Sequence, residues 1–349
     1  YDAGGLNIEE VKSDRTMARK NNIDYNANET IKHLKTGLSW MLNIDSQTDI
    51  QSFAFYQHRD FYSLLPFNFG GIVSLDKNIF GLGSRLQRKK IKDNLINTFQ
   101  LGFDYSNQKD QRDRYRNDFG EQGENVFSQQ EKFSSLGIYA LHQTEFDNGL
   151  LFRFGSRFDS NQISTDNINQ SIVLNKLNPS FGITYNTNKK SNFFVTAGTS
   201  FETPTLNELS NNPTGGMGFN KDLEPISSLS YEYGWKGYFK SSSFEIIGYN
   251  ILSSNEILPF ELEDYPGKNF YTNVGETSRV GLEFNWNYFL PSAIINLSYT
   301  FSDNQFKSYE LNDSQLKGNK IPGIPNQLFD LSVLYKFNKD FNLKLDYQL

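Results

Sequence analysis

Large apolar side chains alternate with small or polar ones along much of this chain. In residues 278–301 (SRVGLEFNWNYFLPSAIINLSYTF), Val280 and Leu282 share one parity, whereas Arg279 and Glu283 share the other. Successive side chains of a β-strand point to opposite faces of the sheet. The segment therefore predicts a two-faced β-hairpin around the short turn LPSA, with one aromatic face and one polar face.

The same alternation, with aromatic enrichment and bounding turn residues, predicts fourteen strands in all. We place them at residues 33–44, 49–59, 79–90, 95–107, 131–146, 150–162, 176–187, 192–202, 228–239, 243–253, 271–289, 293–304, 327–337 and 341–349. The connections between them alternate between short turns, such as DNG and LPSA, and long segments. The long segments centre on residues 60–78, 108–130, 163–175, 203–227, 254–270 and 305–326.

This rhythm of short and long connections favours a barrel with one elaborated rim. A Greek-key sandwich has no reason to keep it, whereas outer-membrane barrels have short periplasmic turns and longer extracellular loops. We therefore predict an all-β fold, a transmembrane antiparallel up-and-down β-barrel, with the aromatic parity toward lipid and the polar parity toward the lumen. The first strand would begin at the outer rim and the last strand would end there. We therefore expect residues 1–349 to be an internal piece of a larger barrel domain.

Composition agrees with a thin apolar surface. The chain has 31 Phe and 19 Tyr, yet its mean hydropathy is −0.58. It has no apolar run of the roughly 20 residues that a membrane-spanning helix needs. A net charge of −6 argues against nucleic-acid binding, and the absence of Cys removes disulfides, thiolate metal sites and cysteine nucleophiles. No Ser-His-Asp set, phosphate loop or deaminase-type zinc motif is present, so we predict that the chain is not an enzyme.

One stretch carries a more specific pattern. Residues 201–237 (FETPTLNELSNNPTGGMGFNKDLEPISSLSYEYGWKG) resemble the barrel of the TonB-dependent outer-membrane receptors, with Ile226 where an acidic residue is usual. Residues 272–286 (TNVGETSRVGLEFNW) and 319–327 (NKIPGIPNQ) are similar to later segments of that family, in the expected order. The opening YDAGGLN resembles a loop of the ferric-citrate-type members.

The resemblance implies a barrel of about 22 strands with an N-terminal plug inside it. The plug, its coupling box and the first and last strands would then be missing from these residues. It implies location in the bacterial outer membrane and active import of ferric siderophore or ferric citrate complexes, powered by the TonB inner-membrane complex through the plug. The ferric complex would be the transported ligand, with no permanently bound cofactor. Outer-membrane lipid and lipopolysaccharide would surround the wall.

The segment KDQRDRYRND (residues 109–118) is the sharpest charge feature, and we place it on an extracellular loop. If it is extended, Arg112, Arg114 and Arg116, which recur around Tyr115, share one face. Guanidinium groups bind carboxylates and phosphates bidentately, so this face could hold an anionic ferric complex or lipopolysaccharide phosphate. The interleaved aspartates favour the alternative, a self-neutralised solvated loop.

Four further side chains are candidates for ligand contact. His58 and Arg59 lie at the predicted outer end of a strand, where they could meet a ligand or form a solvated pair. Arg153 and Arg157 share a lumen-facing parity and could contact a ligand, the plug or water. The chain has only three histidines, without paired carboxylates at ligand spacing, so we predict no metal site.

Three other functions remain open from the residues. A passive outer-membrane channel for small or hydrophobic solutes would need only the barrel wall. A TonB-dependent importer of a non-iron cargo, such as cobalamin or a saccharide, would share every motif above. A soluble β-rich surface binding protein would bury the Phe and Trp faces between two sheets. The Asn- and Gly-rich residues 211–220 could form a mobile gate or a simple connector in any importer.

Overall fold

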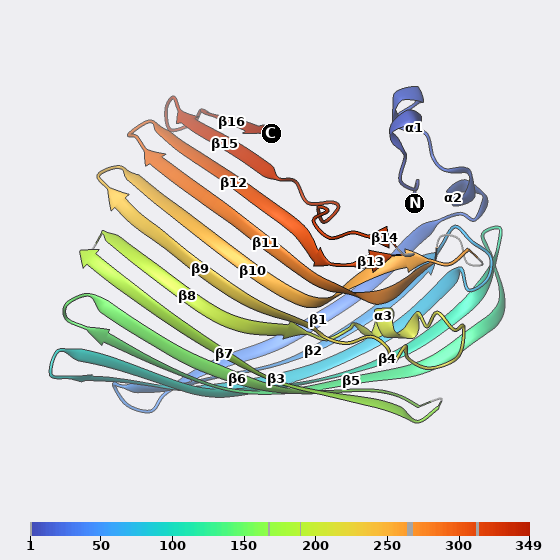
Figure 1. Ribbon diagram of the computed structural model, residues 1–349, viewed down its shortest axis with the longest axis horizontal. Coiled ribbons are helices and arrows are strands. Elements are labelled where there is room, and N and C mark those ends of the chain that lie inside the picture. Colours follow the sequence, from blue (N-terminus) through green and yellow to red (C-terminus); the bar gives the residue numbers. More distant parts are fainter. Residues whose placement is uncertain (1, 167, 189, 264–267, 312–313) are drawn as a thin grey trace.

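The computed structural model describes residues 2–166, 168–188, 190–263, 268–311 and 314–349. Fourteen strands form one sheet in the order β1-β2-β3-β4-β5-β6-β7-β8-β9-β10-β11-β12-β15-β16, and β13 and β14 form a separate small hairpin. Each strand of the large sheet pairs antiparallel with the next, and Figure 1 shows the sheet as a strongly curved wall. The predicted all-β, up-and-down architecture is confirmed.

The strands and three short helices have the following bounds. The first half of the wall is β1 (Asn28–Asn43), β2 (Thr48–Leu64), β3 (Ile72–Lys92), β4 (Leu95–Asp118), β5 (Glu121–Phe146), β6 (Leu150–Thr165), β7 (Gln170–Asn188) and β8 (Ser191–Glu202). The second half is β9 (Ile226–Phe239), β10 (Ser242–Glu261), β11 (Asn269–Phe289), β12 (Ala293–Ser308), β15 (Gln327–Lys336) and β16 (Asn342–Gln348). The remaining elements are α1 (Ile8–Ser13), α2 (Lys20–Asp24), α3 (Leu206–Ser210), β13 (Glu310–Leu311) and β14 (Ser314–Gln315).

All fourteen predicted strands are present, but several continue beyond the predicted ends toward the rim that carries the long connections, here called the outer rim. The largest error concerns residues 108–130, which were expected to be a loop and instead extend β4 and β5 almost to the turn at Phe119 and Gly120. The apolar alternation stops where the outer surface becomes polar, although the backbone ladder continues. Period-two hydrophobicity therefore marks the apolar part of a strand and not its full length.

The outward face of the wall carries a band of exposed apolar side chains. On β4, Phe99, Leu101, Phe103 and Tyr105 are 37–47 % exposed, and the next two residues of this parity toward the rim, Asn107 and Lys109, are polar. In the hairpin of β11 and β12, Val280, Leu282 and Phe301 are exposed outward in the same way. An apolar belt that ends a few residues below the outer rim is the pattern of a sheet facing lipid.

Opposite this belt, the inner face is polar and internally paired. Arg279 of β11 donates to both carboxylate oxygens of Glu256 on β10, at 2.6 and 3.0 Å. The predicted inward orientation of Arg279 is thereby confirmed. Among the described helices, none is long and apolar enough to span a membrane.

Apolar packing gathers inside the mouth of the wall, near the outer rim. The long connection between β8 and β9, residues 203–225, folds inward and buries Leu206, Leu209, Phe219 and Leu223 against Ile163 of β6. We call residues 203–225 the rim strap. It lies beside the inner face of β4, as Figure 1 shows for α3.

Candidate functional site

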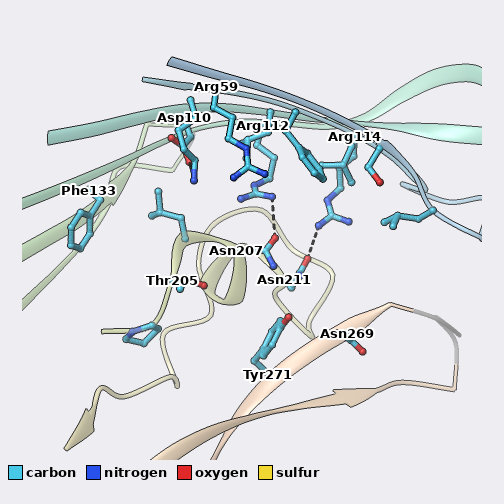
Figure 2. Close-up of a pocket in the computed structure, with 18 of the residues that line it drawn as sticks. Arg59, Asp110, Arg112, Arg114, Phe133, Thr205, Asn207, Asn211, Asn269 and Tyr271 are labelled. Carbon is cyan, nitrogen blue, oxygen red and sulfur yellow. Dashed lines mark hydrogen bonds and ion pairs between the residues drawn. The ribbon is translucent and has the colours of Figure 1, made fainter. Parts of the chain in front are cut away.

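A cavity of about 610 Å³ lies between the rim strap, the inner face of β2, β3 and β4, and the start of β11. We call it the rim cavity. Figure 2 shows side chains entering it from the strands on one side and from α3 and β11 on the other. The lining residues that matter for its chemistry are Arg59, Phe61, Lys77, Asp110, Arg112, Arg114, Phe133, Asn207, Asn211, Lys268 and Tyr271.

Strand register places the charged groups side by side. Arg59 of β2 is directly opposite Lys77 of β3, and Lys77 is directly opposite Asp110 of β4. All three side chains line the cavity, so they form one row across the inner face. Two residues farther along β4, toward the outer rim, Arg112 lines the same cavity, and Arg114 follows at the next alternate position.

Arg112 is held by a buried carboxylate. Its Nε and Nη2 donate to the two oxygens of Glu131 on β5, at 2.8 and 3.2 Å, and its Nη1 donates to Asn207 at 3.2 Å. The Arg112 side chain is 3 % exposed and that of Glu131 is fully buried. Ser210 of α3 also donates to Glu131. The pair therefore fixes the rim strap to the wall, because a buried charge requires a partner.

Arg114 is also buried, but its side-chain hydrogen bond goes to a neutral amide and not to a carboxylate. Its Nη2 donates to the amide oxygen of Asn211 at 2.6 Å. Burial, and secondarily the charge of Arg112, lowers the pKa of Arg114 to about 10. Burial, and then the charge of Arg114, also lowers the pKa of Lys268 to about 8. Both groups lie beyond the apolar belt, and Arg114, with a pKa of about 10, carries its positive charge at neutral pH.

Asp110 is the one carboxylate among the described lining residues. Its side chain is fully buried, and its Oδ2 accepts from Gln108 at 2.9 Å and lies 3.6 Å from Lys77 Nζ. Burial is the main reason that the pKa of Asp110 is raised, although Lys77 acts in the opposite direction. The other oxygen, Oδ1, is buried and has no hydrogen-bond partner in the described part of the chain.

The sequence folds α3 at this place through a local signal. Thr205 and Glu208 form a capping box, in which each side chain accepts from the backbone N–H of the other residue. The following Leu206 and Leu209 are buried, so the helix turns its apolar side to the wall and its amides to the arginines. Sequence reasoning missed this helix, although Thr-x-x-Glu before apolar residues could have revealed it.

The structure corrects the predicted arginine cluster. Arg112 and Arg114 share the inner face, but Arg116 does not line the cavity and instead lies 3.5 Å from Glu124 and 3.6 Å from Asp118. Register irregularities on both sides of Tyr115 interrupt the alternation, so the expectation of three arginines on one face is wrong for Arg116. The expectation of an extracellular loop is also wrong, because all these residues lie in β4.

His58 and Arg59 point to opposite faces of β2. Arg59 lines the rim cavity, whereas His58 pairs with the outward groups Asn78, Asp60 and Asp76. The ligating atoms of His58, Asp60 and Asp76 lie within 4.8 Å of one another and could coordinate a metal ion. The expectation that no histidine has paired carboxylates is therefore wrong for His58, and the missed signal is His-x-Asp on one strand face.

Arg153 and Arg157 face the lumen in the lower part of β6, away from the rim cavity. Arg157 donates to both oxygens of Asp104, at 2.6 and 2.9 Å, and to Asp159 at 2.7 Å. Arg153 donates to Gln143 at 3.3 and 3.1 Å. Asp104 and Asp159 neutralise Arg157, so a ligand there would have to replace existing ion pairs.

Comparison with known families identifies this architecture. A family model described as "TonB dependent receptor-like, beta-barrel" matches residues 2–348. The chain belongs to this family. TonB-dependent receptors are transporters of the bacterial outer membrane and not enzymes, and the outer-membrane location predicted from the sequence is confirmed.

Solved structures of receptors share the fold at low sequence identity. The chain resembles the ferric citrate transporter FecA in its unliganded form, with a TM-score of 0.76 and 18 % identity over 99 % of this chain and 52 % of that one. It also resembles the siderophore receptor PiuA from Acinetobacter baumannii (TM-score 0.69, 16 % identity, covering 89 % and 53 %) and the alcaligin receptor FauA from Bordetella pertussis (0.67, 15 %, 92 % and 54 %). The chain thus spans about half the length of the structures that it matches.

Proposed function

We propose that the chain forms part of the wall and the outer binding cavity of a receptor that imports anionic ferric chelates, of the siderophore or citrate type. The rim cavity would hold the chelate before transport. Energy would come from the TonB inner-membrane complex, which acts through a plug domain in this family. Residues Arg59, Arg114 and Lys268 would face the anionic groups of the chelate.

The charge of the rim cavity is the observation that carries this proposal. Five cationic side chains and one carboxylate are among the described residues that line it. Arg112 is neutralised by Glu131, and Arg59, Lys77 and Arg114 remain against Asp110. A partly buried positive cavity attracts anions more strongly than the same charges would in water.

Apolar lining supports the same ligand class. Phe61, Leu75, Phe133 and Tyr271 line the cavity between the charged groups. Ligand sites are mostly apolar, with a few placed polar groups that fix orientation. A chelate with an organic backbone and peripheral carboxylates offers matching surfaces for both parts of the lining.

Binding of radioiron-labelled ferric citrate to outer membranes that contain the full-length protein tests this proposal. Arg114→Gln should weaken binding about tenfold or more, because a charge-assisted hydrogen bond contributes about 1.5–3 kcal/mol. Arg116→Gln is the matched control, since Arg116 lies two residues away on β4 but outside the cavity. Equal binding by Arg114→Gln and the wild-type protein would contradict the proposed role of the cavity.

The alternative of a non-iron cargo is separated by regulation and by growth. An iron importer should be expressed more strongly when iron is chelated from the medium, and its deletion should slow growth only under that condition. Unchanged expression under chelation would favour cobalamin or a saccharide as cargo. A passive channel would pass ferric citrate without the TonB complex, so uptake in a strain lacking TonB distinguishes it.

A further inference from the structure

Two buried atoms beside the rim cavity have no hydrogen-bond partner within the described residues. One is the acceptor Oδ1 of Asp110, and the other is the donor Nε of Arg59. Both side chains line the cavity, and Figure 2 shows both of them on the strand side. A buried polar atom left unpaired costs about 1–3 kcal/mol, so such atoms require an explanation.

The wall itself cannot supply the missing donor to Asp110. Its neighbours Lys77 and Gln108 already lie beside the other oxygen, Oδ2. Glu131, directly opposite Asp110 on β5, is a carboxylate and is occupied by Arg112, Gln129 and Ser210. None of these groups donates to Oδ1, and the side chain of Asp110 lines the rim cavity, where a ligand can supply the donor.

The charges around Asp110 limit the kind of donor. Lys77 lies 3.6 Å from its carboxylate, and Arg112 follows two residues later on the same face of β4. An ammonium group from a ligand would be repelled by both cations, whereas a neutral hydroxyl or amide N–H would not. Asp110 is thus suited to accept a hydrogen bond from a neutral donor.

We propose that Asp110 determines specificity in the rim cavity by accepting a hydrogen bond from a hydroxyl or amide N–H group of the chelate. The anionic groups of the same chelate face Arg59 and Arg114. The ligand class is therefore a ferric chelate that carries both carboxylates and a neutral hydrogen-bond donor. This inference rests on the proposed function of the cavity.

Two synthetic citrate-based ferric chelates provide the test, identical except that one side arm ends in a hydroxyethyl group and the other in a methoxyethyl group. Outer membranes with the full-length protein should bind the hydroxyethyl chelate about 10- to 100-fold more tightly, the range for a hydrogen bond to a charged group. Asp110→Ala should remove this preference. Asp110→Asn, which keeps one acceptor oxygen but loses the charge, should reduce the preference to severalfold, and an undiminished preference in this variant would overturn the role of Asp110.

Asp113→Ala is the matched control, because Asp113 is three residues along β4 on the opposite face and outside the cavity. It should leave the preference unchanged. Equal binding of both chelates by the wild-type protein overturns the role of Asp110, while the proposed import of anionic chelates stands. If the wild-type protein binds neither chelate, the proposed function fails for citrate-type ligands and this inference fails with it. Should Asp110→Ala not reach the membrane, the wild-type preference and the Asp110→Asn variant decide the question.

Discussion

Arg112 and Arg114 lie two residues apart on one face of β4 but have different partners. Glu131 accepts from Nε and Nη2 of Arg112, whereas the side-chain hydrogen bond of Arg114 goes to the neutral amide of Asn211. Arg112 therefore stabilises the attachment of the rim strap, and Arg114 keeps positive charge directed at the cavity. The two arginines lie on the same face of one strand, but their neighbours give one a structural role and the other a role in binding.

Replacing the buried carboxylate should show the structural role of Arg112. Glu131→Gln leaves Arg112 as an uncompensated buried charge, so the free energy of unfolding should fall by about 3–5 kcal/mol. Urea titration of the lipid-reconstituted protein measures the change. Glu124→Gln, which removes one of the two exposed partners of Arg116, should cost less than about 1 kcal/mol. A similar loss in both variants would show that the Arg112–Glu131 pair is not the anchor described here.

Lys268 should make chelate binding depend on pH. Burial beside Arg114 lowers the pKa of Lys268 to about 8, so its ammonium group loses its proton as the pH rises through that value. Loss of a positive charge weakens binding of an anion, and the affinity for ferric citrate should therefore fall severalfold between pH 7 and pH 9. Arg114, with a pKa of about 10, stays charged over this interval. Lys268→Met should bind more weakly at pH 7 and lose the dependence, which equilibrium binding at several pH values measures. A wild-type affinity that is flat from pH 7 to pH 9 excludes this role.

Strand existence could be predicted from the sequence far better than strand length. The lipid-facing part of β4 can be recognised in the sequence from Phe99, Leu101, Phe103 and Tyr105, because one face of the strand is apolar there. Near the outer rim both faces are polar, and nothing in the residue pattern separates an extended ladder from a loop. Prediction of the functional site was limited in the same way. Arg112 and Arg114 could be singled out, but Glu131 and Asn211, which decide their roles, lie 19 and 97 residues away and meet them only in the fold.

The rim strap was the element least determined by its own sequence. Its Asn- and Gly-rich residues 211–220 suggested either a gate or a flexible connector. In the structure Phe219 is buried, and the N–H groups of Gly218 and Phe219 donate to Gln129 and Gln170. Leu209 is buried nearer the start of the rim strap, so the strap is held to the wall at two points.

Removing the apolar anchor should loosen the rim strap without affecting the wall. Leu209 is 1 % exposed, so Leu209→Ala should cost about 2–5 kcal/mol of local packing. Limited trypsin digestion of intact outer membranes should then cleave faster at Lys221, which lies in the strap. Met217→Ala is the control, because Met217 belongs to the same segment and is 53 % exposed. An unchanged cleavage rate in Leu209→Ala would mean that the polar contacts alone hold the strap.

At the scale of the whole molecule, one curved sheet separates two environments. Its outer face presents an apolar belt, as at Val280 and Leu282, and its inner face carries ion pairs such as Arg279 with Glu256. The rim cavity lies above that belt, on the side of the long connections, and is closed partly by the rim strap. Binding groups can therefore stay polar and charged without entering the part of the wall that faces lipid.

The same separation predicts how the wall responds to a new charge. Leu282 points outward from β11 and is 44 % exposed, so Leu282→Arg places a guanidinium in lipid at a cost of about 2–4 kcal/mol near the bilayer midplane. Assembly should fall, as measured by the fraction of full-length protein that shows heat-modifiable mobility in outer-membrane extracts. Asn285→Lys is the matched substitution, because Asn285 has the opposite parity on the same strand and faces the polar interior with Glu245 across the ladder. It should assemble normally. If both variants assemble equally well, the belt does not meet lipid, and if only Asn285→Lys fails, the two faces of the wall have been assigned the wrong way round.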